Sequence, residues 1–239
     1  MRDTRIQKVL SELGLCSRRA AEQIILEGRV TLNGRPVQLG DKMDTMKDHL
    51  AVDGQTVRIP KKSEYYYYML HKPRGYVTTM SDERGRKTVV ELLEGTPVRV
   101  YPIGRLDKDS EGLLLMTNDG DLAYRLTHPK HHVYKTYRAR VNGILSMDKA
   151  ERLRRGVDIG GFVTSKSKVE ILKHGDHSTI VEIQIYEGKN RQVRKMFASV
   201  GNKVIDLERI AIGDLHLGHL KSGHWRKLTQ REIEYLKKL

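Results

Sequence analysis

Cysteine is nearly absent from this chain of 239 residues, which contains only Cys16. A single thiol excludes a disulfide framework and a zinc site built on several cysteines, and it is typical of a protein from a reducing cytosol. The chain also lacks an apolar run long enough to cross a membrane, the apolar core of a signal peptide, a heptad pattern and an internal repeat. We therefore expect a soluble, cytoplasmic protein that does not enter a membrane.

Acidic residues are outnumbered, since 44 Lys and Arg face 30 Asp and Glu, and the formal net charge is +14. This excess favours a polyanionic partner such as a nucleic acid. The charge is unevenly spread, because residues 1–60 hold ten basic and eight acidic residues and so contribute only +2. The other +12 belongs to residues 61–239, so we expect these residues to make many of the contacts with the phosphate groups of a nucleic acid.

The first sixty residues have the pattern of a small independent module. Apolar spacing predicts a helix over 6–13 and a second helix over 17–28, with Ser17 as the N-cap of the second. Asn33-Gly34 and Asp53-Gly54, each flanked by alternating apolar residues, predict two tight hairpins. Two helices followed by a small sheet form a unit that can fold by itself.

Three segments of this module, 5–10, 16–22 and 28–34, resemble the alpha-L RNA-binding motif of a small-subunit ribosomal protein and many RNA-modifying enzymes. The similarity covers most of residues 4–55 and implies that the two helices present a basic face to the RNA backbone. On charge alone, the same residues could form an ordinary solvated helix surface. The phosphate contacts that the resemblance implies are Arg5, Lys8, Arg18, Arg19 and Arg29.

A polar segment at 58–64, which contains Pro60, is the best candidate for a linker. Beyond it, residues 65–239 mix strands and short helices without regular βα alternation, which is typical of an α+β domain. We expect strands at 65–70, 113–116, 133–141, 169–172 and 180–186, and helices at 89–93, 121–126 and 191–200. The run of four tyrosines at 65–68 is read as part of a half-buried strand.

Residues 104–120 are the most informative stretch, because an apolar run there lies between two charged turns that contain glycine. Asp107 lies in the first turn, between Gly104 and Gly112 and after the basic Arg105. A carboxylate in such a turn can be a nucleophile, a general base, a metal ligand or a solvated loop charge.

Basic and aromatic clusters accompany Asp107 at 72–74, 84–87, 128–137 and 187–196. Together with the N-terminal module, they resemble the RsuA/RluB-type family of ribosomal RNA pseudouridine synthases. The resemblance covers nearly the whole chain, and the segments that carry it are 72–75, 104–107, 135–137, 187–196, 207–210 and 223–228.

The resemblance implies an enzyme that detaches uracil from its ribose and rejoins it through carbon five, with no cofactor and no metal. It implies a domain with a mixed, largely antiparallel sheet and Asp107 in its cleft as the nucleophile. Tyr137 would stack on the flipped base, and a cation would keep Asp107 ionised. Lys189 is the first choice for this cation, and Arg191 and Arg194 are the alternatives. Further contacts to RNA or base are expected from Lys72, Arg74, Arg105 and Leu207.

Each assignment has a plainer alternative. Asp107 can be a turn carboxylate, Tyr137 and Leu207 can be core residues, and Lys189, Arg191 and Arg194 can all be solvated phosphate contacts. A non-catalytic RNA-binding or ribosome-assembly protein would also explain the basic surface.

A metal-dependent nuclease or phosphatase is another alternative, because carboxylates pair at 107/109 and 119/121 near histidines 128, 131 and 132. Lys108 interrupts the first pair, however, and the histidine spacing lacks a distant partner.

The prediction is a monomeric ribosomal RNA pseudouridine synthase with an RNA-binding domain at 1–60 and a catalytic domain at 65–239. The segment 187–196 resembles the large-subunit enzymes and favours large-subunit RNA as the target. The residues at 108–112 also occur among small-subunit relatives, so small-subunit RNA stays open as the target.

Overall fold

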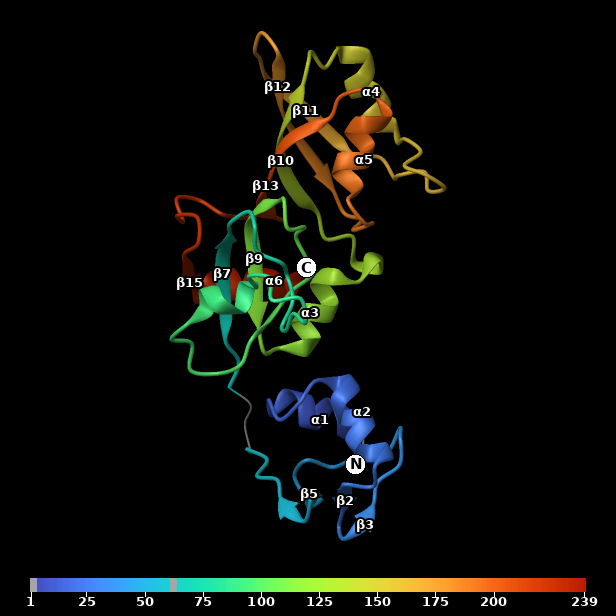
Figure 1. The fold of residues 1–239 in the computed structure, drawn as a ribbon, viewed down its shortest axis with the longest axis vertical. Helices are drawn as coiled ribbons and strands as arrows, with labels where there is room; N and C mark the ends of the chain where they lie inside the picture. The colour runs from blue at the N-terminus through green and yellow to red at the C-terminus, as the bar shows by residue number, and fades with distance from the viewer. Residues whose placement is uncertain (1–3, 61–63) are drawn as a thin grey trace. The chain divides into compact units, whose positions relative to one another are not determined.

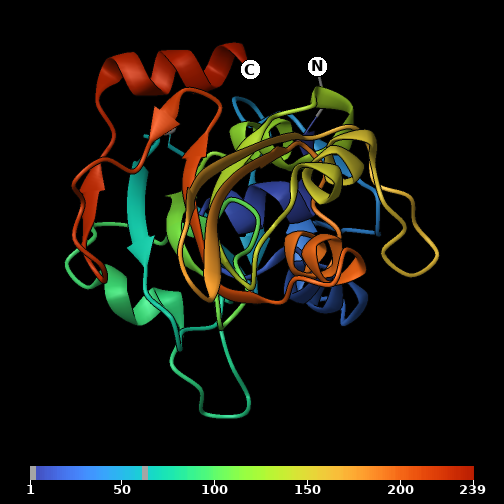
Figure 2. The same ribbon diagram turned by 90° about the horizontal axis from the view of Figure 1, so that it is seen from above.

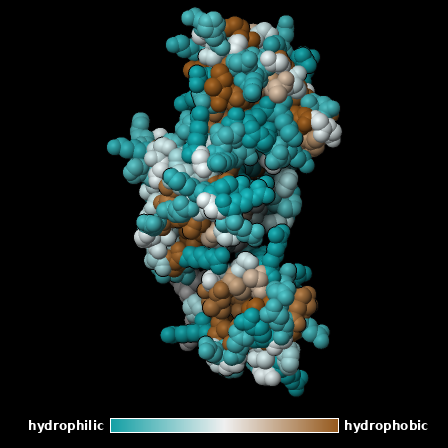
Figure 3. All heavy atoms as spheres, in the orientation of Figure 1, coloured by the Kyte–Doolittle hydropathy of each residue, from teal (hydrophilic) through white to brown (hydrophobic). Residues whose placement is uncertain are grey.

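The computed structural model describes residues 4–60 and 64–239, which divide into two compact units, Met1–Tyr65 and Tyr66–Leu239 (Figure 1). The linker expected at 58–64 includes residues 61–63, which lie outside the described residues. Within the described ranges, no helix is both long and apolar enough to cross a membrane. On the face that Figure 3 shows, hydrophilic residues cover most of the surface and apolar residues form separate patches.

The first unit contains two helices and two small sheets. The helices are α1 (Ile6–Glu12) and α2 (Arg18–Leu26). The larger sheet has the order β3-β2-β5-β6, with the strands β2 (Val30–Leu32), β3 (Arg35–Pro36), β5 (Leu50–Val52) and β6 (Gln55–Thr56). A separate pair joins β1 (Thr4–Arg5) to β4 (Lys42–Met43).

Local sequence signals explain this unit. The Ser17 hydroxyl accepts a hydrogen bond from the backbone N–H of Ala20 at 3.1 Å, so it caps α2 as expected. Asn33-Gly34 and Asp53-Gly54 all have φ between 50° and 77°, the left-handed conformation that a two-residue hairpin turn requires. The helices and the sheet share one core, whose largest fully buried side chains are Ile6, Leu10, Met43 and Leu50.

The second unit is built on one nine-stranded sheet with the main order β11-β12-β10-β13-β9-β7-β15. All pairings are antiparallel except that of β9 with β13, so the expectation of a mixed, largely antiparallel sheet is confirmed. The strands are β7 (Tyr67–Lys72), β8 (Tyr101–Pro102), β9 (Glu111–Thr117), β10 (Lys135–Asn142), β11 (Lys168–His174), β12 (Ser178–Ile185), β13 (Val204–Ile212), β14 (Leu215–His216) and β15 (Trp225–Lys227).

Helices cover the two halves of this sheet separately, as Figures 1 and 2 show. One half packs β10, β12 and β13 against α4 (Met147–Arg155) and α5 (Gln192–Ser199). The other half packs β7 and β9 against α3 (Gly120–Thr127) and α6 (Gln230–Lys238). Two short 3-10 helices, η1 (Val89–Leu93) and η2 (Pro129–His131), complete the unit. The two halves meet where β9 pairs with β13.

The tyrosine run differs from its expected structure. Strand β7 begins only at Tyr67, and Tyr67 and Tyr68 are both buried, so the strand is not half-buried. The reason is that both of its faces are covered: Tyr67 packs in the core beneath α3 and α6, and Tyr68 packs in a core with Val89 of η1.

Candidate active site

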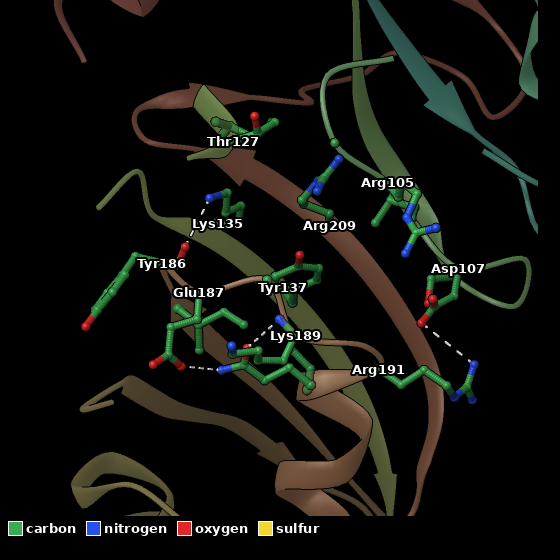
Figure 4. Close-up of a pocket in the computed structure, with 18 of the residues that line it drawn as sticks. Arg105, Asp107, Thr127, Lys135, Tyr137, Tyr186, Glu187, Lys189, Arg191 and Arg209 are labelled. Carbon is green, nitrogen blue, oxygen red and sulfur yellow. Dashed lines mark hydrogen bonds and ion pairs between the residues drawn. The ribbon is translucent and has the colours of Figure 1, made fainter. Parts of the chain in front are cut away.

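A cavity of about 270 Å³ opens beside the junction of β9 and β13 (Figure 4). Its walls come from the loop before β9, from β10 and β13, and from the segment between β12 and α5. Of the residues expected at the site, the structure brings six to this cavity: Arg105, Asp107, Tyr137, Lys189, Arg191 and Leu207.

Asp107 lies in a loop that the surrounding chain holds firmly. The backbone N–H of Ser110 donates to the carbonyl oxygen of Asp107 at 3.1 Å, which closes a tight turn. The preceding residue, Leu106, is buried, and its carbonyl oxygen accepts from the Thr78 hydroxyl at 2.7 Å. The Asp107 side chain itself remains about one-third exposed (35 %), so a ligand can reach its carboxylate.

Arg191 is the cation beside Asp107. Its Nη1 lies 3.7 Å from Oδ2 of Asp107, and its two terminal nitrogens each donate to a different carboxylate oxygen of Asp109 at 2.9 Å. These hydrogen bonds from Arg191 hold the pKa of Asp109 below its usual range. A guanidinium with several donors can thus serve two carboxylates at once, which a lysine ammonium does less well.

Lys189 does not lie beside Asp107, so the choice of Lys189 as the cation that pairs with Asp107 is corrected. Its ammonium lies 4.4 Å from the centre of the Phe162 ring. Arg191 has a left-handed backbone (φ 53°) just before α5, and in Figure 4 its side chain extends to Asp107 while Lys189 lies below Tyr137. Arg194 instead binds Asp109, with Nη2 donating to the backbone carbonyl oxygen at 2.8 Å.

Tyr137 and Leu207 come from neighbouring strands of the sheet. Tyr137 on β10 pairs with Arg209 on β13. Two residues further along β10, Ala139 pairs with Leu207 on β13. Because side chains alternate along a strand, Tyr137 and Leu207 face the same side of the sheet. A half-buried ring and a buried leucine on this wall can hold a flat ligand in front of Asp107.

Lys72 is fully buried, so the expectation that it contacts RNA is wrong for this structure. Its ammonium donates to the carbonyl oxygens of Pro73 at 3.0 Å and Ser110 at 2.8 Å, and thereby ties the end of β7 to the Asp107 loop. Burial lowers the pKa of Lys72 to about 8. The sequence did not reveal this, because a basic residue next to a turn is usually exposed.

Arg74 lies outside the cavity and is already paired. Its guanidinium contacts Glu111 at 3.0 Å and Asp206 at 2.6 Å, and hydrogen bonding to Asp206 raises its pKa. Arg105 is exposed at the rim of the cavity and has no hydrogen bond or ion pair within 4–60 and 64–239. Arg105 is therefore better placed than Arg74 to meet an incoming phosphate.

Two basic residues of the cavity, Lys135 and Arg209, were not singled out from the sequence as site residues. Arg209 was only part of a C-terminal pattern, and Lys135 was only part of the segment that contains Tyr137. The structure buries Arg209 to 4 % exposure and places both cations on the cavity wall. For Lys135 the available signal was its position in the strand expected at 133–141, where it falls on the same face as Val133 and Ala139. No strand was expected around Arg209, so its burial had no such signal.

The first unit holds the five other basic residues expected to contact RNA. Arg5, Arg18 and Arg19 are exposed. The Nζ of Lys8 lies 3.6 Å from Oε1 of Glu12, which is one turn further along α1. Arg29 is held by Asp53 at 2.7 Å and Glu27 at 3.1 Å, so its charge is already paired with carboxylates.

Two of the four carboxylates that suggested a metal-dependent enzyme, Asp109 and Asp119, have other partners. Asp109 binds Arg191, and Asp119 caps α3 by accepting from the backbone N–H groups of Asp121 and Leu122. Asp119 also accepts from the Tyr67 hydroxyl at 2.8 Å. In the described part of the chain, no group of three or more His, Cys, Asp or Glu residues could hold a metal ion.

Comparison with known proteins identifies the family. Residues 66–199 match the family model described as RNA pseudouridylate synthase, and residues 4–48 match the S4 domain. A Bacillus subtilis protein named ribosomal large subunit pseudouridine synthase B is 42 % identical over 238 residues, which cover 98 % of this chain and 96 % of that protein. An uncharacterized RNA pseudouridine synthase of Aquifex aeolicus is 41 % identical over 238 residues, covering 99 % of this chain and 94 % of its own.

Among solved structures, one described as a pseudouridylate synthase aligns with a TM-score of 0.70 at 33 % identity and covers 98 % of this chain and all of its own. The fold and these similarities agree, and the chain belongs to the RNA pseudouridylate synthase family, as an RNA pseudouridine synthase that carries an S4 domain.

Proposed function

We propose that this enzyme converts a uridine of large-subunit ribosomal RNA to pseudouridine, with Asp107 as the nucleophile. The observation that carries the proposal is a reachable Asp107 carboxylate beside Arg191 at a cavity that also holds Tyr137. The choice of RNA is supported by the 42 % identity to a large-subunit enzyme and by the net charge of +14.

Asp107 forms a covalent adduct that divides one difficult step into two easier ones. The adduct forms either at carbon six of the base or at carbon one of the ribose. The uracil then turns and rejoins the ribose through carbon five, and Asp107 is released as a carboxylate. Arg191 keeps a positive charge beside Asp107 throughout, because a nearby cation favours the ionised carboxylate.

Tyr137 and Leu207 hold the base during this exchange. A uridine inside folded RNA has to be flipped out, which costs about a few kcal/mol. Stacking of the base on the Tyr137 ring stabilises the flipped state by about 1–3 kcal/mol and so offsets part of that cost. Arg105 and Lys189 at the cavity rim lie where the RNA backbone of the flipped nucleotide has to pass.

The division of labour follows the two units, with residues 1–60 as the RNA-binding domain and 65–239 as the catalytic domain. Exposed cations of the first unit, Arg18 and Arg19 above all, neutralise phosphates of the RNA. We further propose that the enzyme works as a monomer in the cytoplasm, where ribosomal RNA is found.

Tritium release from RNA labelled at carbon five of uridine tests the proposal. The purified protein is incubated with transcripts of large-subunit and of small-subunit ribosomal RNA. We expect tritium release from the large-subunit transcript. In a strain that lacks the gene, we expect large-subunit RNA to have lost one pseudouridine. Release only from the small-subunit transcript would reassign the target, and no release from any ribosomal RNA would overturn the proposal.

A further inference from the structure

Two basic side chains that the proposed chemistry leaves unused, Lys135 and Arg209, line the same cavity as Asp107. Lys135 begins β10, and Arg209 lies on β13 opposite Tyr137. In Figure 4, Lys135 lies on one side of the cavity and Asp107 on the other, with Tyr137 and Arg209 between them. A base stacked on Tyr137 therefore lies within the field of both cations.

Both cations have hydrogen-bond donors without acceptors. Arg209 donates through Nε to the carbonyl oxygen of Leu113 at 2.7 Å, but its Nη2 is buried with no partner. The Lys135 ammonium donates to the carbonyl oxygen of Tyr186 at 3.1 Å and makes no further hydrogen bond or ion pair within 4–60 and 64–239. A buried donor without an acceptor is costly, as at Arg209, and the half-buried Lys135 ammonium has donors left for a ligand in the cavity.

Among the residues that the structure describes, no carboxylate forms an ion pair with either cation. Asp109 is held by Arg191, and Glu187 accepts hydrogen bonds from Ser165 at 2.6 Å and from Gln192 at 2.6 Å. Burial, and secondly the charge of Arg209, lower the pKa of Lys135 to about 8, so Lys135 is still mostly charged at neutral pH. The side of the cavity remote from Asp107 therefore carries positive charge.

We propose that Lys135 and Arg209 stabilise the negative charge that develops on uracil during isomerisation, with the Lys135 ammonium donating to a carbonyl oxygen of the base. Arg209 acts as a fixed charge beside it and keeps β13 attached to β9 through its bond to Leu113. This inference rests on the proposed function and assigns residues to the electrostatic part of the same reaction.

Both routes for Asp107 place one negative charge on the base. When a carboxylate oxygen adds to carbon six, the electron pair of the C5=C6 double bond moves towards O4 and gives an enolate. When the oxygen instead bonds to carbon one of the ribose, the N1–C1′ bond breaks and its electron pair stays on uracil, shared by O2 and O4. Fixed cations in a site that excludes water stabilise such a charge without reorganisation.

The decisive variant is Lys135→Met, which keeps an unbranched side chain only one atom shorter and removes its charge. Lys135→Arg restores the charge, and Lys173→Met, on an exposed part of β11, is the matched control. Single-turnover rate constants for pseudouridine formation and the Kd for the same RNA are measured from pH 6 to pH 9.5. Thermal unfolding checks that each variant folds.

We expect Lys135→Met to lower the single-turnover rate constant about 100-fold at neutral pH and to change Kd less than about threefold. The wild-type rate should fall as pH rises through about 8, where Lys135 loses its proton, and this decline should vanish in Lys135→Met. The titratable and charged groups at this cavity are Arg105, Asp107, Tyr137, Tyr186, Glu187, Lys189, Arg191 and Arg209. Of these, Arg209 is the charge that shifts the pKa of Lys135.

A folded Lys135→Met enzyme with a rate within about threefold of wild type would overturn the inference, as would a Lys135→Arg enzyme no better than Lys135→Met. Lys173→Met should match wild type, and an equal loss there would assign the effect to general RNA binding and overturn the inference too. A wild type that isomerises no ribosomal uridine would instead contradict the proposed function, and this inference with it.

Discussion

Gly112 on β9 lies directly opposite Arg209 on β13, so close that a β-carbon at position 112 would lie 2.3 Å from the carbonyl oxygen of Arg209. Gly112 also has a φ of +109°, which side chains rarely allow. This contact joins the only parallel pair among the described strands and positions the Asp107 loop five residues upstream of Gly112.

Gly112→Ala should therefore separate β9 from β13. We expect a loss of about 2–4 kcal/mol in the free energy of unfolding, from backbone strain and the forced gap together. Urea unfolding of Gly112→Ala beside Gly85→Ala measures it. Gly85 also has a positive φ but an open surrounding, so Gly85→Ala should cost less. Equal losses in the two variants would show that the contact with Arg209 adds nothing.

Asp107→Asn should abolish isomerisation and leave RNA binding nearly unchanged. The amide keeps the shape of the side chain but cannot form the covalent adduct, so we expect a loss of about 10⁴-fold or more in rate. Tritium release and filter binding measure the two properties separately. Mass spectrometry is the control against deamidation back to aspartate, and substantial activity in verified Asp107→Asn would refute the role of Asp107 as nucleophile.

Much of the architecture could be read from the sequence because its signals are local. The Ser17 cap, the two Xaa-Gly hairpins and the strand that follows Asp107 each depend on neighbouring residues. The burial of Lys72 could not be predicted, because its acceptors include Ser110, which lies 38 residues away. The choice of Arg191 over Lys189 also depends on a long-range contact, to Asp107 and Asp109 in another loop.

Arg191→Gln should be far more damaging than Lys189→Met. Arg191 contacts Asp107 and Asp109, whereas the Lys189 ammonium lies over Phe162. We expect about a 100-fold loss of single-turnover rate for Arg191→Gln and less than about tenfold for Lys189→Met. The reverse order of these two losses would restore Lys189 as the functional cation.

The stability of the protein should rise with pH above 8. Lys72 and Lys135 both have pKa values of about 8 in the folded state, below the ordinary 10.5, so the unfolded chain binds more protons between these values. The free energy of unfolding therefore increases with pH in this window, by up to about 1.4 kcal/mol per pH unit for each lysine. Chemical unfolding at pH 8, 9 and 10 should show a smaller increase for Lys135→Met, and an equal increase would contradict the low pKa of Lys135.

The double variant Arg18→Gln/Arg19→Gln should weaken RNA binding without lowering the rate of the bound complex. Both side chains are exposed on α2, so each can release a counterion from the RNA when it contacts a phosphate. We expect the slope of log K against log salt to become shallower by about 1 for each lost contact. The matched control is Arg154→Gln/Arg155→Gln on α4 of the other unit, where both guanidinium groups pair with Glu151. An unchanged slope in Arg18→Gln/Arg19→Gln would show that α2 does not bind the RNA backbone.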